Sequence, residues 1–148
     1  MALTYRLLGS SDARAFTNVA REVFDELVDE RLVHEFLRDP RHHIAVALDE
    51  GCIIGFASAI DYVHPDKAPE LWVNEVGVSP GYRRRGIGKR LLALLFNEAA
   101  RLGCTEAWVL TDRDNAAANA LYSAAGSDRG SEQVMHTFPV AKRGREPA

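Results

Sequence analysis

The chain has 148 residues, a formal net charge of -3 at pH 7, 47% hydrophobic residues and 26% charged residues. These values are typical of a globular protein, and the length suits one domain with one core rather than two. The sequence therefore predicts a single domain over residues 1–140 and a solvated tail over residues 141–148. The acidic balance argues against a nucleic-acid-binding protein, which needs basic charge gathered on one face.

The spacing of the cysteines and the first residues of the chain indicate in which cellular compartment the protein is expected. Cys52 and Cys104 lie far apart and outside any Cys-x-x-Cys pattern, so a disulfide framework is not expected. The first residues lack the plan of a secretion signal, and no apolar run approaches the roughly 20 residues that cross a bilayer. No His, Cys and carboxylate spacing resembles a metal site. We expect a cytoplasmic protein that binds no membrane, nucleic acid or metal.

The first forty residues predict one strand and two helices. Residues 4–8 alternate weakly and indicate a strand. Residues 10–24 begin with three capping residues and carry apolar side chains at helical spacing, which predicts a helix. A second helix is expected over residues 29–38, and Pro40 ends it.

The next segment predicts an antiparallel hairpin, a loop and a strand. Residues 42–48 and 52–60 are rich in strand formers and are joined by a short turn in which Gly51 supplies a positive φ. Residues 61–70 are polar and hold two prolines, so we expect a loop there. Residues 71–78 then predict another strand.

The remaining chain alternates helices and strands. Residues 87–102 repeat apolar side chains about every four positions, which predicts a long amphipathic helix. A strand is expected over residues 106–111, a helix over residues 115–126 and a last strand over residues 132–138. The order predicts a mixed α and β fold.

The stretch "VGVSPGYRRRGIGKRLL" places three arginines directly before two glycines. It is not a P-loop: Gly81 and Gly86 have the spacing, but Ile87 stands where the lysine is needed. It is not a dinucleotide fingerprint either, because that motif needs a glycine three residues after Gly88, where this chain has Leu91.

A strand, a basic turn with glycines and a long helix together expose backbone N–H groups at the positive end of a helix. Such a site binds a phosphate chain, and the arginines can add charge-assisted hydrogen bonds. The alternative is an exposed basic turn whose glycines give only flexibility. The residues of the predicted cradle are Arg83, Arg84, Arg85, Gly86, Ile87, Gly88 and Lys89.

Two motifs carry a family resemblance. Arg83, Gly86 and Gly88 match the pattern [QR]-x-x-G-x-[GA] between a strand and a helix. A second pattern, N-x-x-A-x-x-L-Y-x-x-x-G, is matched downstream by Asn115, Ala118, Leu121, Tyr122 and Gly126. With both motifs in this order, the chain resembles the GCN5-related N-acetyltransferases, the GNAT family.

The resemblance implies an α/β fold with a mixed, mostly antiparallel sheet of six to seven strands and about four helices. The sheet would be splayed between its fourth and fifth strands, with acetyl-CoA in the opening. Within the family, the chain looks most like the short aminoglycoside 3-N-acetyltransferases. Members of the family are often dimers, so a homodimer stays an alternative to a monomer.

Acetyl transfer to an amine needs a proton acceptor, donors that polarise the thioester and a proton for the leaving thiolate. The resemblance implies that the backbone of Val76, Gly77 and Val78 contacts the cofactor. Glu75 is the expected general base, directly or through a water, and Tyr122 the expected general acid. The alternatives are a strand-end glutamate in a salt bridge and a tyrosine packed on the sheet.

The resemblance also assigns Asn115 and Ala118 to the cofactor, although a helix N-cap would explain Asn115 equally well. Asp112, at the end of a strand, is a candidate for the acceptor site, or is a carboxylate that the helix dipole favours before the start of a helix. An acidic cluster between the first two expected helices would attract a polycationic amine, or is simply a solvated helix face. Its members are Asp25, Glu26, Asp29 and Glu30.

The sequence thus predicts an acetyl-CoA-dependent N-acetyltransferase whose acceptor amine attacks the thioester directly in a ternary complex. A small aminated molecule such as an aminoglycoside is the first acceptor candidate. A protein N-terminus, a polyamine and an amino-acid-like amine remain alternatives. A non-catalytic acyl-CoA sensor is the alternative from another functional class.

Overall fold

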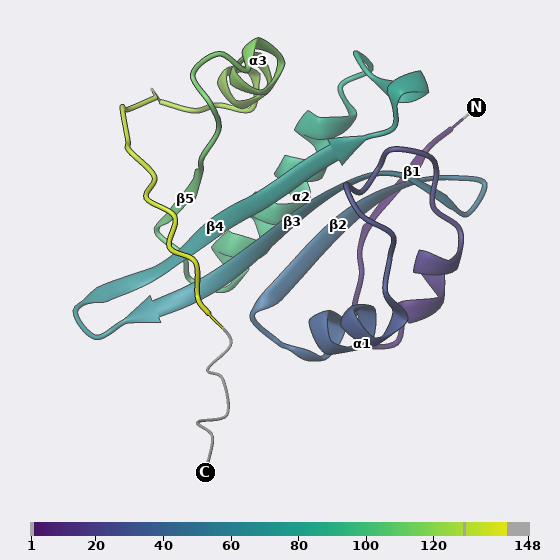
Figure 1. The fold of residues 1–148 in the computed structure, drawn as a ribbon, viewed down its shortest axis with the longest axis horizontal. Coiled ribbons are helices and arrows are strands. Elements are labelled where there is room, and N and C mark those ends of the chain that lie inside the picture. The colour runs from purple at the N-terminus through teal and green to yellow at the C-terminus, as the bar shows by residue number, and fades with distance from the viewer. Residues whose placement is uncertain (1, 129, 142–148) are drawn as a thin grey trace.

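The computed structural model describes residues 2–128 and 130–141 and has a mixed sheet with helices on both faces (Figure 1). The strands are β1 (Thr4–Leu7), β2 (His42–Asp49), β3 (Cys52–His64), β4 (Lys67–Val78) and β5 (Glu106–Val109). The α-helices are α1 (Glu30–Arg38), α2 (Ile87–Arg101) and α3 (Ala116–Ala124), and the 3₁₀ helices are η1 (Ala13–Thr17) and η2 (Pro80–Tyr82).

The sheet order is β1-β2-β3-β4-β5. The first four strands pair antiparallel with their neighbours, and β5 joins β4 in parallel. The predicted mixed, mostly antiparallel α/β fold is confirmed. The described residues hold five strands rather than six to seven, and three α-helices rather than four.

The β2–β3 hairpin forms as predicted. Its turn residues Glu50 and Gly51 have φ of +48° and +80°, the left-handed pair that a two-residue hairpin turn requires.

Each face of the sheet has its own core. On one face, α2 packs Leu91 and Leu95 against Ala45, Ala57 and Val73 of the strands. On the other face, the segment that holds η1 and α1 packs over β2 and β3. Figure 1 shows α2 behind the sheet and α1 in front of it. The second core comprises Leu8, Val23, Val33, Leu37, Ile44, Val46, Ile53 and Phe56.

The prediction of a helix over residues 10–24 is wrong. Only the 3₁₀ turn η1 forms, and the hydroxyl of Thr17 donates to the carbonyl of Arg14 at 2.7 Å, which ends it. The backbone then bonds to β3 instead of continuing a helix: Ile53 N–H donates to Asn18 O and Ala20 N–H donates to Ile53 O, both at 2.9 Å. Hydrogen bonding to β3 therefore outweighed the local helical propensity of this segment.

The prediction of a loop over residues 61–70 is also wrong. β3 runs on to His64, and β4 already begins at Lys67. Pro65 lies in the tight turn between them. Pro69 lies within β4 beside a shift in the β3–β4 register, a position where a missing N–H costs little.

The last predicted strand, residues 132–138, does not form in the described structure. Val134, Met135 and Phe138 are 81%, 77% and 78% exposed. Their apolar pattern favours a strand, but a strand needs a partner edge, and β5 offers only four residues. The predicted tail beyond residue 141 lies outside the described residues.

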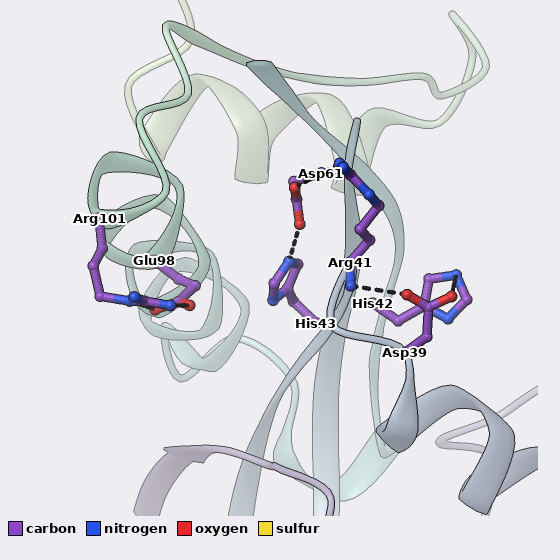
Figure 2. A network of polar contacts seen from close by, with 7 residues as sticks. All are labelled: Asp39, Arg41, His42, His43, Asp61, Glu98 and Arg101. Atoms are coloured by element: carbon purple, nitrogen blue, oxygen red, sulfur yellow. Dashed lines mark hydrogen bonds and ion pairs between the residues drawn. The ribbon is translucent and has the colours of Figure 1, made fainter. Parts of the chain in front are cut away.

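A buried ion pair joins β2 to the far end of β3. Asp61 accepts from His43 Nε2 at 2.6 Å and from the Arg41 guanidinium at 3.3 Å, as Figure 2 shows. The side chains of His43 and Asp61 are only 11% and 12% exposed. Asp61 is thus a buried carboxylate held by two partners that precede or begin β2, and these contacts fix how β2 lies against β3. Glu98 and Arg101 of α2 form a neighbouring, more exposed pair.

The irregular segment between η1 and α1 lies directly against the end of β4. A Cβ built on Gly77 would come within 2.4 Å of the Val23 carbonyl oxygen and 2.7 Å of the Phe56 ring. Val23 and Phe56 are themselves buried. Gly77 is therefore required so that this segment can cover the strand.

We expect Gly77→Ala to lower the free energy of unfolding by about 2 kcal/mol, because the added methyl group overpacks a contact made by backbone. Urea denaturation measures the change. Gly81→Ala is the matched control: a Cβ there meets nothing within 4 Å and its φ is not positive, so it should change stability by less than about 0.5 kcal/mol. Equal effects of the two variants would contradict the packing role of Gly77.

Candidate active site

β5 ends half-way along β4, and the two strands part there. They pair only from Glu70 to Val73 on β4 and from Glu106 to Val109 on β5. β4 continues to Val78, while the chain after β5 leads away towards α3 (Figure 1). The predicted splay between the fourth and fifth strands is confirmed. It leaves one backbone edge of β4 without a strand partner over residues 74–78 in the described structure.

A β-bulge lies at the start of this unpaired stretch. Ser58 opposes Glu75 and Ala59 opposes Val73, so Asn74 is an extra residue in β4. Without the bulge, Glu75 would share the face of Val73, which is buried against α2. With it, Glu75 lies on the other face beside Ser58, and its side chain is exposed. The structure thus presents the predicted general base to solvent at the splay.

The loop between β4 and α2 is tied down from several sides. The Ser79 hydroxyl donates to Arg21 O at 3.1 Å, and the Tyr82 hydroxyl donates to Asp49. That bond to a carboxylate raises the pKa of Tyr82 above its ordinary value. Arg83 Nε donates to Val78 O at 3.1 Å. The loop is therefore held in one conformation by its own side chains.

The three consecutive arginines do different things. The guanidinium of Arg83 closes the loop, and Arg85 donates to Gly81 O at 3.2 Å and lies 5.3 Å from the centre of the Tyr82 ring. Arg84 adopts a left-handed backbone with φ of +63°. Its guanidinium makes no hydrogen bond or ion pair within the described chain, and neither does the ammonium of Lys89. Arg84 and Lys89 are the cations left for a ligand.

The first turn of α2 fits an anion. Gly86 is its N-cap, with φ of +73° and no side chain capping the helix. The first backbone N–H groups of the helix, at Ile87, Gly88 and Lys89, thus keep their hydrogen-bonding capacity beside a basic loop. A diphosphate such as that of acetyl-CoA suits this set of donors.

The two glycines of the first motif have separate structural reasons. A Cβ on Gly86 would meet nothing within 4 Å, so its requirement is the left-handed backbone. A Cβ on Gly88 would lie 3.0 Å from the Leu121 side chain of α3. Gly88 is therefore needed for close contact between α2 and α3.

Side-chain amides shape the start of α3. Asn115 is its N-cap, and its Oδ1 accepts from Ala118 N–H at 3.1 Å, as the capping interpretation predicted. Asn119, which the sequence analysis missed, donates from Nδ2 to the carbonyls of Asp112, Arg113 and Asn115 at 2.9–3.2 Å. An asparagine one turn after a capping asparagine was the available signal. These bonds fix the strand-to-helix turn that holds Asp112.

Tyr122 lies on α3 and is half-buried against the core beneath α2, a cluster that includes Ile87 and Leu91. Burial disfavours its phenolate and raises the pKa of Tyr122 above the ordinary value of 10.0. Its hydroxyl is therefore protonated at neutral pH and can act as a proton donor.

The predicted acidic cluster divides into two parts. Asp29 caps α1, accepting from Arg31 N–H at 2.8 Å, and Glu30 faces His34 one turn on. Both have ordinary helix-end roles. Asp25 and Glu26 are exposed in the irregular segment that crosses the end of β4, so of the four predicted carboxylates only these two lie on the part of the chain that packs beside the splay.

Residues 2–128 and 130–141 contain neither a metal-binding cluster nor a helix suited to span a membrane. Within them, no three His, Cys, Asp or Glu side chains come together in a way that could hold a metal ion. No helix in that part of the chain has the length and apolar character needed to cross a bilayer.

Residues 11–126 match the profile of the acetyltransferase (GNAT) family. The N-alpha-acetyltransferase RimI of Mycobacterium tuberculosis is 33% identical over 129 residues, which cover 86% of this chain and 79% of that protein.

Solved structures share the fold. The aminoglycoside acetyltransferase meta-AAC0020 from an uncultured soil metagenomic sample, crystallised with sisomicin, superposes with a TM-score of 0.82 at 21% identity, covering 95% of this chain and 97% of that one. AAC(6')-Iy in complex with the bisubstrate analogue CoA-S-monomethyl-acetylneamine gives a TM-score of 0.77 at 21% identity, covering 95% and 100%.

We expect Arg84→Ala to raise the Kd for CoA about tenfold or more, since a charge-assisted hydrogen bond contributes about 1.5–3 kcal/mol. Isothermal titration at two salt concentrations measures the loss and its electrostatic part. Arg90→Ala removes the same charge from α2, but this guanidinium lies 4.0 Å from the Tyr5 ring centre and serves as the control. An equal loss in both variants would point to general charge rather than to a site at Arg84.

Proposed function

Since the chain belongs to the acetyltransferase (GNAT) family, we propose that this acetyl-CoA-dependent N-acetyltransferase acts on a primary amine of a small aminated molecule, with an aminoglycoside as the first candidate. The observation that carries the proposal is the exposed Glu75 at the parting of β4 and β5, on the sheet face away from α2.

In the proposed reaction, acetyl-CoA supplies an activated thioester. The first turn of α2 and the side chains of Arg84 and Lys89 hold its diphosphate. The edge of β4 from Val76 to Val78 has no strand partner in the described part of the chain and offers backbone groups to the rest of the cofactor, apart from the Val78 carbonyl, which accepts from Arg83. Binding at these points aligns the thioester with the strand that carries Glu75.

Glu75 then accepts a proton from the attacking amine, directly or through one water, as the nitrogen forms its bond to the acetyl carbon. The Tyr122 hydroxyl donates a proton to the departing thiolate. The products are an N-acetylated amine and free CoA. No covalent bond to the enzyme is required, which agrees with Cys52 and Cys104 lying outside both motifs.

Acidic groups support a cationic acceptor. Asp25 and Glu26 are exposed on the segment that crosses the end of β4, and Asp112 is exposed in the turn after β5. Carboxylates at these positions would attract a cationic acceptor. Aminoglycosides carry several ammonium groups. Acetylation at the 3-amino group is suggested by the family resemblance alone, whereas the structural neighbour AAC(6')-Iy carries a 6' designation. Analysis of the acetylated product identifies which amine has reacted.

A protein N-terminus is the second candidate acceptor. It is favoured by the 33% identity to the RimI enzyme of Mycobacterium tuberculosis. A single assay separates the two candidates: CoA release measured with sisomicin, with spermidine and with short peptides beginning in alanine. Turnover on peptides alone would contradict the small-molecule proposal.

Glu75→Gln should lower kcat by about 100-fold, because the variant keeps the shape of the side chain but cannot accept a proton. CoA release under saturating acetyl-CoA measures kcat, and titration with CoA should give an unchanged Kd. Glu98→Gln, on α2 across the sheet, is the matched carboxylate control and should keep full activity. Full activity in Glu75→Gln would remove this residue from the mechanism.

Tyr122→Phe should lower kcat about 100-fold with little change in CoA affinity. Because burial raises the pKa of Tyr122, its protonated form persists above pH 10, so loss of this proton should appear only as an alkaline limb beyond that pH. A pH profile of kcat measures the limb, which should be absent from the variant. A limb that survives in Tyr122→Phe would belong to another group.

A further inference from the structure

Three aromatic side chains form a platform on the sheet face that carries Glu75. Trp72 of β4 and Trp108 of β5 stack with ring centres 5.7 Å apart and an angle of 17° between planes. Tyr62 of β3 meets Trp108 edge-on at 6.5 Å. All three side chains are partly exposed, so part of this aromatic cluster remains in contact with solvent. We call these three residues the aromatic shelf.

The strand register places the shelf beside the reacting site. Trp72 opposes Ile60, and Glu75 opposes Ser58, two residues apart on the same face of β3. The bulge at Asn74 is what brings Trp72 and Glu75 to one face. Three residues of strand separate them by roughly 10 Å, the reach of one or two sugar rings.

Hydrogen bonds fix the rings. Trp108 Nε1 donates to the Tyr62 hydroxyl at 2.8 Å, and that hydroxyl donates to Glu70 Oε1 at 3.1 Å. The polar edges of Tyr62 and Trp108 are thereby satisfied within the protein, which holds their apolar faces in position. Ordered aromatic side chains of this kind can pack against the C–H face of a sugar ring at low entropic cost.

Unbalanced negative charge borders the shelf. Glu70 opposes Glu106 of β5 in the register, so two carboxylates face each other on neighbouring strands. Like charges in this arrangement destabilise a sheet. Within the described residues neither carboxylate forms an ion pair, and the ammonium of Lys67 at the hairpin end contacts Asp66. A bound cation would relieve this repulsion.

We propose that the aromatic shelf, with Glu70 and Glu106, binds a second ring of a polycationic amino sugar whose reacting amine lies at Glu75. The ring packs on the exposed part of the Trp72 and Trp108 pair, and an ammonium group on it contacts the facing carboxylates. The inference rests on the proposed function and sharpens it, because it selects a ring-bearing polycation over a linear polyamine or a peptide.

Intrinsic fluorescence tests the shelf directly, because Trp72 and Trp108 are the only two tryptophans of the chain. The protein is titrated without acetyl-CoA against sisomicin, which has rings and charge, spermidine, which has charge alone, and trehalose, which has rings alone. We expect sisomicin to shift the emission and to protect it from acrylamide quenching, with much weaker responses to the other two. An equal response to spermidine, or none to sisomicin, would overturn the proposal.

Variants give a second measurement. Trp72→Ala should weaken sisomicin binding roughly three- to tenfold, and Trp72→Phe, which keeps a ring face, less than threefold. In both variants Trp108 remains as the reporter. Unchanged CoA binding shows that each variant is folded. Equal affinity of Trp72→Ala and the unaltered protein for sisomicin would overturn the stacking role.

The two proposals fail separately. A fluorescence response to sisomicin without any CoA release would support the shelf and sink the proposed acetylation of aminoglycosides. CoA release with sisomicin at a KM that Trp72→Ala leaves unchanged would support the enzyme and sink the shelf.

Discussion

The candidate site depends on the parting of β4 and β5 after only four paired residues. The parallel pair cannot lengthen because the chain after β5 turns into α3, which packs on α2. Leu121 rests over Gly88, and the Asn119 amide binds three carbonyls of the turn. The unpaired edge of β4, the open first turn of α2 and the half-buried Tyr122 are thus produced by one packing arrangement.

The bulge at Asn74 decides what this opening presents. In a regular strand the side chains of Trp72 and Glu75 would point to opposite faces. The extra residue brings both to the face away from α2, so the strand offers a carboxylate and an aromatic surface to the same ligand. Gly77 has a related role at the end of the same strand, since only glycine lets the segment around Val23 pack over it.

Stability and binding use neighbouring residues for different purposes. Arg83 and Arg85 serve the loop itself, while Arg84 between them has a left-handed backbone and a side chain without a partner in the described residues. At the far end of β3, Asp61 is committed to His43 and Arg41 on the face of α2. Tyr62, the next residue, points the other way and supports Trp108.

The sequence by itself determined the family, the hairpin at Gly51, the long helix α2 and the capping role of Asn115. These depend on local patterns: two spaced motifs, a left-handed glycine, helical periodicity and a side chain that reaches its own backbone. Tertiary structure alone decided that residues 10–24 bond to β3 instead of forming a helix, and that residues 61–70 are strand. It also decided that Glu75 lies on the same face of the sheet as Trp72. A bulge and a strand edge involve residues far apart in the chain, so no local pattern records them.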